Sequence, residues 1–169
     1  MMRKILYGKG TAFTRRPIEM SDFDAISELE SNPTVMQYTS MGKAQTYSET
    51  KARLARHLSV EYDDPNLGIY GYFDKDRLVT WVMLIPIDGK LMLGYMSHPD
   101  YWGQGITSAL ISDFIEQLPA HIGAQRIYAL VEKKNTASIR LVERIGFTLY
   151  ASQELEDKND ELREYCLGG

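Results

Sequence analysis

The segment Tyr101-Trp102-Gly103-Gln104-Gly105-Ile106-Thr107-Ser108-Ala109-Leu110 places two glycines between an extended apolar run and a helical pattern. This order predicts a strand, a tight turn and the start of a helix. Glycine tolerates a positive φ and leaves no Cβ in the way of a ligand. The first helical turn leaves its N–H groups unpaired and carries a partial charge of roughly +0.5. Such a turn suits an anion such as a diphosphate, although a plain strand-to-helix connection uses the same residues.

The bulk composition is that of one folded domain, covering residues 1–169, with 44% hydrophobic and 25% charged residues. A formal net charge of −4 and the lack of a basic block argue against nucleic acid as a partner. The single cysteine, Cys166, excludes an internal disulfide and fits a reducing compartment. The sequence has no apolar run near the roughly 20 residues of a membrane span, and residues 1–8 lack the apolar core of a signal peptide. We therefore expect a cytoplasmic protein with no membrane partner and no metal.

The chain before the glycine turn alternates between helical and strand patterns. Ser21 opens a helical pattern, where its hydroxyl would accept from the N–H of Asp24, and Asn32-Pro33 ends that pattern. Thr46 and Glu49 form a capping-box pattern that starts a second helix. Strands are expected at 13–16, 67–73, 78–85 and 91–97, the last two joined by a hairpin turn at Asp88-Gly89.

The chain after the glycine turn predicts a parallel strand pair. Apolar residues recur at helical spacing up to Pro119, namely Ile106, Leu110, Phe114 and Leu118. A strand at 126–131 follows that helix, so it runs parallel to the strand at 91–97. A helix from Asn135 to Gly146, strands at 147–151 and 162–167 and a loop or hairpin at 153–160 complete the chain. The expected fold is an α/β mixed sheet in the order β-α-α-β-β-β-α-β-α-β-β, with helices on both faces.

A second segment gives the glycine turn a context. Asn135-Thr136-Ala137-Ser138-Ile139-Arg140-Leu141-Val142-Glu143-Arg144-Ile145-Gly146-Phe147, at this distance from His98-Pro99-Asp100-Tyr101-Trp102-Gly103-Gln104-Gly105, resembles the GNAT acetyltransferase superfamily. The branch that contains the ribosomal-protein N-terminal acetyltransferases is the most similar, because Ser31-Asn32-Pro33-Thr34-Val35-Met36 and Leu93-Gly94-Tyr95 also match it. The resemblance extends from about Phe13 to Tyr150. It implies that the fourth and fifth strands are parallel and splayed, that acetyl-CoA is the donor and that a primary amine is the acceptor.

The resemblance also implies a set of site residues. The backbone of Met96, Ser97 and His98 would bind the pantetheine arm and the acetyl carbonyl. The pyrophosphate would lie on the amides after Trp102, those of Gly103, Gln104, Gly105, Ile106, Thr107 and Ser108. Asn135 would bond the cofactor near the thioester, and Ser138 would assist the departing thiolate. Simpler roles stay open: helix cap for Asn135, solvated surface for Ser138, turn residue for His98 and packing anchor for Trp102.

Several positions depart from the family pattern. Trp102 replaces the Gln or Arg that opens the pyrophosphate motif, as is usual in this branch, and Thr107 replaces a Gly or Ala. Val142 stands where many members have a tyrosine general acid, and Met92 stands where the branch often has a carboxylate. The resemblance therefore leaves the enzyme without its common general base. Proton removal would pass through water, assisted by His98, Tyr95 or Glu132.

The absence of the common general base affects which kind of amine can be the acceptor. A lysine amine with a pKa near 10.4 is neutral about once in a few thousand at pH 7, whereas an N-terminal amine with a pKa near 7.8 is neutral roughly once in seven. This difference favours a protein or peptide N-terminus as acceptor, catalysed by positioning. Two alternatives are a small amine (a polyamine, amino sugar or amino acid) and an acyl-CoA-binding module with little catalysis.

The acceptor pocket is expected between the first two helices and the last hairpin. Side chains that could line it are Met36, Tyr38, Met41, Tyr70 and Tyr72. Tyrosines at strand spacing also pack within sheets, so sheet packing is the competing interpretation for Tyr70 and Tyr72. The sequence does not decide the oligomeric state, and a homodimer is one option.

Overall fold

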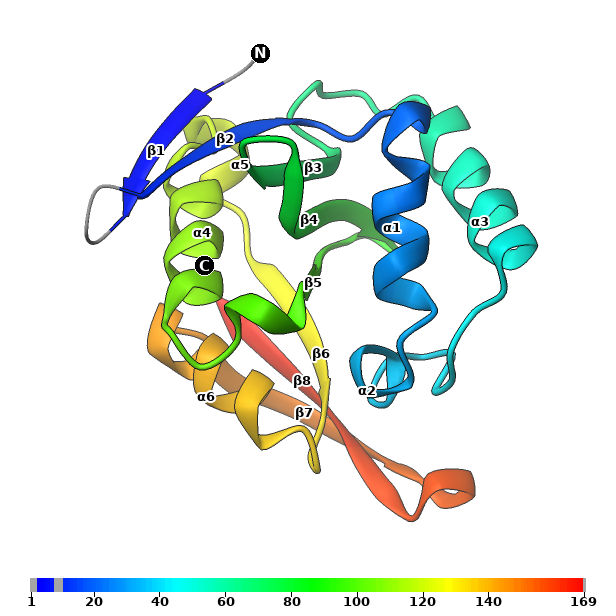
Figure 1. Cartoon of the computed structure of the whole chain (residues 1–169). Helices are drawn as coiled ribbons and strands as arrows, with labels where there is room; N and C mark the ends of the chain where they lie inside the picture. The colour runs from blue at the N-terminus through cyan, green and yellow to red at the C-terminus, as the bar shows by residue number, and fades with distance from the viewer. Residues whose placement is uncertain (1–2, 8–10, 169) are drawn as a thin grey trace.

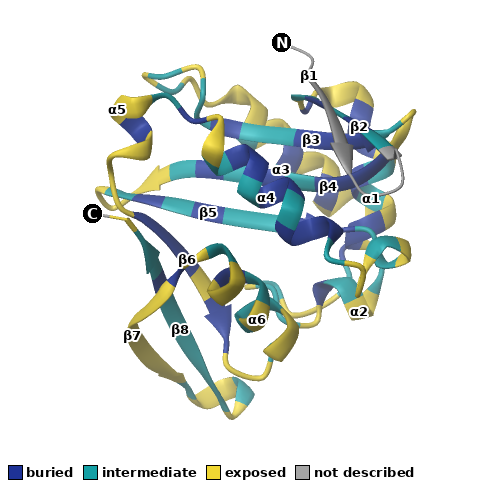
Figure 2. Ribbon diagram, turned by 90° about the vertical axis from the view of Figure 1, so that its left-hand side faces the viewer, coloured by how far each residue is buried: buried dark blue, intermediate teal, exposed yellow. Residues whose placement is uncertain are grey.

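A computed structural model describes residues 3–7 and 11–168 of the chain. Residues 1–2, 8–10 and 169, which belong to the predicted domain of residues 1–169, lie outside the described part. A mixed sheet runs through the molecule, and helices cover both of its faces (Figures 1 and 2). Residues 1–2 and 8 of the segment judged not to be a signal peptide are among those not described.

The described residues form an eight-stranded sheet in the order β1-β2-β3-β4-β5-β6-β8-β7. The strands are Arg3–Tyr7, Thr11–Pro17, Gly68–Asp74, Arg77–Ile87, Lys90–Ser97, Ile127–Glu132, Thr148–Leu155 and Asp160–Leu167 for β1 to β8. Only the pair β5 and β6 is parallel; every other pair in this described sheet is antiparallel. The predicted mixed sheet is confirmed, with one strand, β1, that the sequence analysis did not anticipate.

The helices pack on the two faces of the sheet and form two separate parts of the core. The six α-helices in the described part are Phe23–Glu30, Pro33–Met36, Tyr47–Ser59, Ile106–Glu116, Ala120–Gly123 and Thr136–Ile145 for α1 to α6. Residues of α4, α5 and α6 share one buried cluster, and residues of α1, α2 and α3 share the other. Alternate residues of the central strands feed the two clusters, since Leu93 belongs to the first and Met96 to the second.

Local signals agree with the structure at most helix ends. Thr46 and Glu49 form the expected capping box of α3, and Gly146 ends α6 with a φ of 117°. The expected cap by Ser21 is wrong, because the short 3₁₀ turn Met20–Asp22 precedes α1. There the Asp22 carboxylate accepts from the N–H of Glu19 at 2.8 Å and closes the turn instead.

Strands β5 and β6 separate along their length. They pair only at Leu91–Ile127, Met92–Tyr128 and Leu93–Ala129, although β5 continues to Ser97 and β6 to Glu132. Meanwhile β5 stays in register with β4 up to the pair of Thr80 and Ser97. The two strands diverge visibly in Figure 2. The predicted splay of this parallel pair is therefore confirmed, and it opens beside the turn that leads into α4.

Candidate active site

The glycine turn depends on backbone conformation. Gly103 and Gly105 have φ values of 72° and 73°, in the left-handed region that costs other L-residues roughly 1–2 kcal/mol. Gly105 is the N-cap of α4. A Cβ at Gly103 would meet no atom within 4 Å, so the space beside this backbone is open. The turn therefore places backbone amides next to open space, which fits the cradle of an anion.

The first turn of α4 is fastened to the end of β5 by buried hydroxyls. The Ser97 hydroxyl is 2.7 Å from that of Thr80 and 2.8 Å from that of Thr107. The Thr107 hydroxyl, absent from the usual family motif, thus joins the helix start to the sheet. The Ser108 hydroxyl donates to the Gly105 carbonyl at 3.0 Å. These bonds keep the α4 amides at the mouth of the splayed strands.

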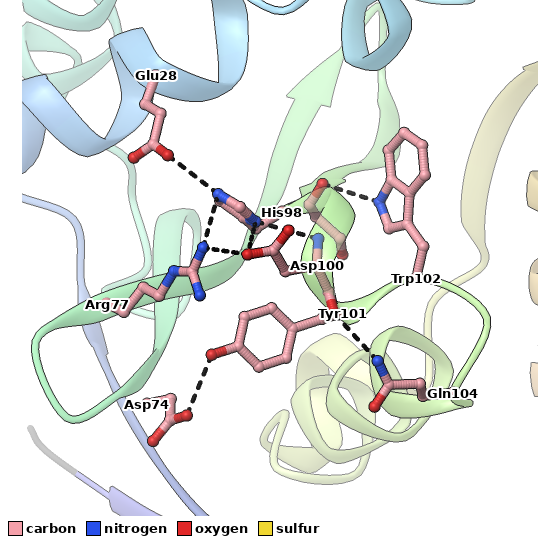
Figure 3. Close-up of polar contacts among 9 residues, drawn as sticks. Glu28, Asp74, Arg77, His98, Asp100, Tyr101, Trp102 and Gln104 are labelled. Carbon is pink, nitrogen blue, oxygen red and sulfur yellow. Dashed lines mark hydrogen bonds and ion pairs between the residues drawn. The ribbon is translucent and has the colours of Figure 1, made fainter.

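Trp102 braces the same region. Its indole N–H donates to the Ser97 carbonyl at 3.0 Å, while 43% of the residue stays exposed (Figure 3). Gln104 donates from its side chain to the Asp100 carbonyl at 3.0 Å. The first contact ties the turn to the end of β5, and the second lies within the turn.

The hydrogen-bond register selects which backbone groups of β5 face the opening. The N–H of His98 donates to the Val79 carbonyl at 2.8 Å, so this pair bonds directly across the ladder with β4. Bonded pairs alternate in an antiparallel ladder. Met96 therefore bonds toward β4 as well, while the backbone groups of Tyr95 and Ser97 point toward β6. The expectation of a continuous run from Met96 to His98 is corrected accordingly: residues 95 and 97 face the opening.

His98 is held by polar contacts on both ring nitrogens (Figure 3). Its Nδ1 accepts from the Asp100 N–H at 3.2 Å, while its Nε2 lies 3.1 Å from a Glu28 oxygen and 3.2 Å from an Arg77 nitrogen. Arg77 also lies 2.5 Å from Asp100, and its hydrogen bond lowers the pKa of that carboxyl. In this arrangement His98 caps the turn Pro99–Tyr101, and both of its ring nitrogens have polar partners.

Tyr95, Ser138 and Asn135 connect β5 to α6 across the opening. The Tyr95 and Ser138 hydroxyls are hydrogen-bonded, and the Asn135 side chain accepts from the Ser138 N–H at 3.2 Å. Burial raises the pKa of Tyr95 to about 12, so its hydroxyl stays protonated at neutral pH. The structure thus brings together three of the four predicted catalytic residues and confirms that Asn135 caps α6.

The five candidate acceptor residues do not form one pocket. Met36 is buried in the cluster of α1 to α3, Met41 packs against that cluster, and Tyr38 lies half-buried just after α2. Tyr70 and Tyr72 share the other cluster, where the Tyr70 ring packs on Phe114. They point the same way because residues two apart on a strand share a face. Tyr72 is fully buried and therefore packs within the sheet, whereas Tyr70 is half-buried and its acceptor role stays a prediction.

Two features near the open strands were missing from the expected site. A cavity of about 440 Å³ lies between α1 and the end of β5, lined by Asp24, Ala25, Glu28, Asp76, Arg77, Leu78 and His98. In addition, Lys158 lies 2.9 Å from the buried carboxylate of Glu132, at the end of β6. The sequence named Glu132 only as one possible aid to proton removal and contained no signal for Lys158, because their contact joins segments that are distant along the chain.

No helix in residues 3–7 and 11–168 is long and apolar enough to cross a membrane. Within the same residues, no group of three or more His, Cys, Asp or Glu side chains could hold a metal ion.

Comparison with known proteins decides the family. The model of the acetyltransferase (GNAT) domain matches residues 13–148. The chain belongs to the GNAT acetyltransferase family. Enzymes of this family use acetyl-CoA, and the match supports acetyl transfer as the activity of this chain. The alternative of a binding module with little catalysis is therefore set aside.

Relatives of this GNAT enzyme differ in the acceptors that their names carry. An uncharacterized N-acetyltransferase, p20 of Bacillus licheniformis, is 25% identical over 138 residues, covering 79% of this chain and 78% of that protein. The spermidine N(1)-acetyltransferase of Escherichia coli K12 is 19% identical over 134 residues, covering 79% of this chain and 72% of that protein.

Solved structures share the fold of this GNAT enzyme. Spermidine N-acetyltransferase from Vibrio cholerae, in complex with CoA and spermine, has a TM-score of 0.75 at 19% identity and covers 92% of this chain and 94% of its own. RimL, a ribosomal L7/L12 α-N-protein acetyltransferase in complex with CoA, has a TM-score of 0.73 at 18% identity and covers 98% and 97%. At these identities the likeness concerns the fold and does not select an acceptor.

Proposed function

We propose that this enzyme transfers the acetyl group of acetyl-CoA to the α-amine of a protein or peptide N-terminus. The observation that carries the proposal is the pairing of splayed strands with a chain of neutral hydroxyls and no free base among the candidates. Tyr95 stays protonated, His98 is held through both ring nitrogens, and Glu132 is paired with Lys158. A site of this kind favours an acceptor that is already partly neutral at pH 7.

The donor has a clear place in this proposal. Acetyl-CoA supplies the thioester whose acetyl group is transferred. The backbone amides of residues 103–108 hold its pyrophosphate, and the open space beside Gly103 admits the phosphates. The backbone of Tyr95 and Ser97, which faces β6, binds the pantetheine arm and offers N–H donors to the acetyl oxygen. Asn135 orients the first turn of α6 beside it.

The hydroxyl pair of Tyr95 and Ser138 assists the leaving group. The neutral amine attacks the acetyl carbon, the C–S bond breaks, and Ser138 donates a proton to the thiolate while Tyr95 resupplies Ser138 and regains a proton from water. The amine loses its surplus proton to water. A thiol pKa near 8.5 means that the departing group needs little protonation, so this assistance is worth about one to two orders of magnitude in rate.

A panel of acceptors tests the proposal. The release of free CoA thiol is measured at pH 7 with peptides that carry a free α-amine and with N-acetylated peptides whose only amine is a lysine. The neutral fractions predict a kcat/KM roughly 300-fold higher for the α-amine. Equal values for the two peptides would contradict the proposal.

A small polyamine is the second candidate. The spermidine N-acetyltransferases among the relatives, together with Asp24, Glu28 and Asp76 in the cavity beside α1, favour a cationic acceptor. Adding spermidine, an amino sugar and free amino acids to the panel separates this candidate from the first. A cytoplasmic location and a homodimer remain predictions, which fractionation and light scattering would check.

A further inference from the structure

Glu132 occupies the open end of the splayed pair. It is the last residue of β6, beyond Ala129, where pairing with β5 stops. Ala129 and Val131 belong to the cluster under α4 and α6, so the alternating residues Leu130 and Glu132 face the side of the sheet that carries α1 to α3. The glycine turn leads into α4 on the opposite side. Glu132 therefore lies on the acceptor side of the proposed reaction.

The Glu132 carboxylate holds a primary ammonium from the same chain. Only 6% of the Glu132 side chain is exposed, and its Oε2 accepts from Lys158 Nζ at 2.9 Å. The same nitrogen donates to the Thr39 carbonyl at 3.1 Å, and a Cβ on Gly42 would lie 3.5 Å from it. Lys158 comes from the tip of the β7–β8 hairpin, below α2 in Figure 1, and Thr39 from the segment after α2. Three segments thus meet around one ammonium.

This arrangement has the chemistry of an amine-binding site. A carboxylate and a backbone carbonyl are groups that recognise R–NH₃⁺, and a substrate amine presents the same group as Lys158. We propose that Glu132 and the Thr39 carbonyl form the ammonium site for the acceptor, and that Lys158 occupies it as an internal competitor until the acceptor displaces it. This inference rests on the proposed acetyl transfer to an amine.

The direction in which Lys158→Met changes the KM for the amine shows whether Lys158 competes with the acceptor or only holds the hairpin in place. If Lys158 only fastens the hairpin to the segment after α2, Lys158→Met lowers stability and raises the KM for the amine. If Lys158 competes with the acceptor, Lys158→Met leaves Glu132 open and lowers the KM for the amine about three- to tenfold, with kcat and the KM for acetyl-CoA unchanged. Lys158→Arg keeps the charge and keeps the KM near that of the wild type.

Matched variants complete the test. Lys133→Met removes the exposed lysine that lies 3.8 Å from Glu161, near the same hairpin, and should leave the KM unchanged. Glu132→Gln should raise the KM for the amine at least tenfold, and Lys158→Met should give no gain in that background. A KM that rises in Lys158→Met, or stays constant in both the Lys158 and the Glu132 variants, overturns the inference.

A second readout does not depend on turnover. Lys158 should be shielded from an amine-reactive acylating reagent in the free enzyme and become more reactive when the best acceptor of the panel is added without acetyl-CoA, as measured by peptide mass spectrometry. Unchanged labelling of Lys158 argues against displacement. If no amine is acetylated at all, the proposed function fails; if acetylation proceeds with unaltered labelling and KM values, only the ammonium site fails.

Discussion

The two ends of the opening between β5 and β6 are built in different ways. The proposed donor end is one contiguous stretch, residues 103–108, whose backbone amides would hold the pyrophosphate. The proposed acceptor end gathers the Thr39 carbonyl and the charged side chains of Glu132 and Lys158 from segments far apart in the chain. The donor end is consequently sensitive to backbone conformation, while the acceptor end is sensitive to charge and to the docking of a hairpin.

Disturbing the backbone of the donor end should have the largest effect. Gly105→Val forces a β-branched residue into a φ of 73° and should weaken acetyl-CoA binding about 100-fold, as measured by calorimetry. Gly89→Val is the matched control, because Gly89 has a φ of 78° in the β4–β5 hairpin. Gly89→Val should lower the free energy of unfolding by a similar amount and leave the affinity for acetyl-CoA unchanged. Equal losses of affinity in both variants would mean that strain alone, and not the amide cradle, explains the effect.

The hydroxyl pair should give a smaller effect, confined to turnover. Tyr95→Phe and Ser138→Ala should each lower kcat about 10- to 30-fold, and the double variant should resemble the single ones, because the two hydroxyls act in series. Since the pKa of Tyr95 is about 12, kcat should show no alkaline loss from this residue below about pH 10. If the loss of kcat in the double variant equals the product of the two single losses, the hydroxyls act separately.

The smallest effect should concern stability on the acceptor side. Asp22 fixes the start of α1 to β2 through Arg16, which donates at 2.7 and 2.8 Å. Burial alone would raise the pKa of Asp22, but these bonds and the one from Glu19 outweigh it and lower the pKa below 3.8. Asp22→Asn should reduce the free energy of unfolding by about 1–3 kcal/mol at pH 7.

The pH dependence of that variant has a definite sign. A lowered pKa stabilises the fold above about pH 4, and this contribution is lost as the pH falls through the folded-state value. The difference between wild type and Asp22→Asn, measured by urea unfolding, should therefore shrink between pH 5 and about pH 2. Asp157→Asn, at an exposed position, is the control and should show no such trend.

The sequence was informative where structure is local. The glycine turn, the capping box at Thr46 and the hairpin at Asp88 depend on neighbouring residues, and each was predicted correctly. The helices α2 and α5 are single turns with too few residues to form a periodic pattern. Strand β1 was not predicted because it is stabilised by pairing with β2, and no local sequence pattern indicates that pairing.

In the candidate site, too, local features could be predicted and long-range contacts could not. Ser138 and Asn135 were placed through a contiguous motif, whereas the bond from Ser138 to Tyr95 spans 43 positions and needs the folded sheet. Tyr72 is fully buried, which the sequence could not show because residue type alone does not say which face of a strand reaches solvent. The backbone correction at Met96 required the register between β4 and β5, which depends on the whole meander.

The outer rim of the sheet at β7 has its own consequence. This strand is the last in the order, nearly every residue on it is exposed, and its ladder with β8 shifts between Leu149 and Ala151. A bulge at an edge interrupts the row of amides that a foreign strand would use as a template. The outer strand of the hairpin can therefore stay exposed to solvent without seeding the growth of a sheet between molecules.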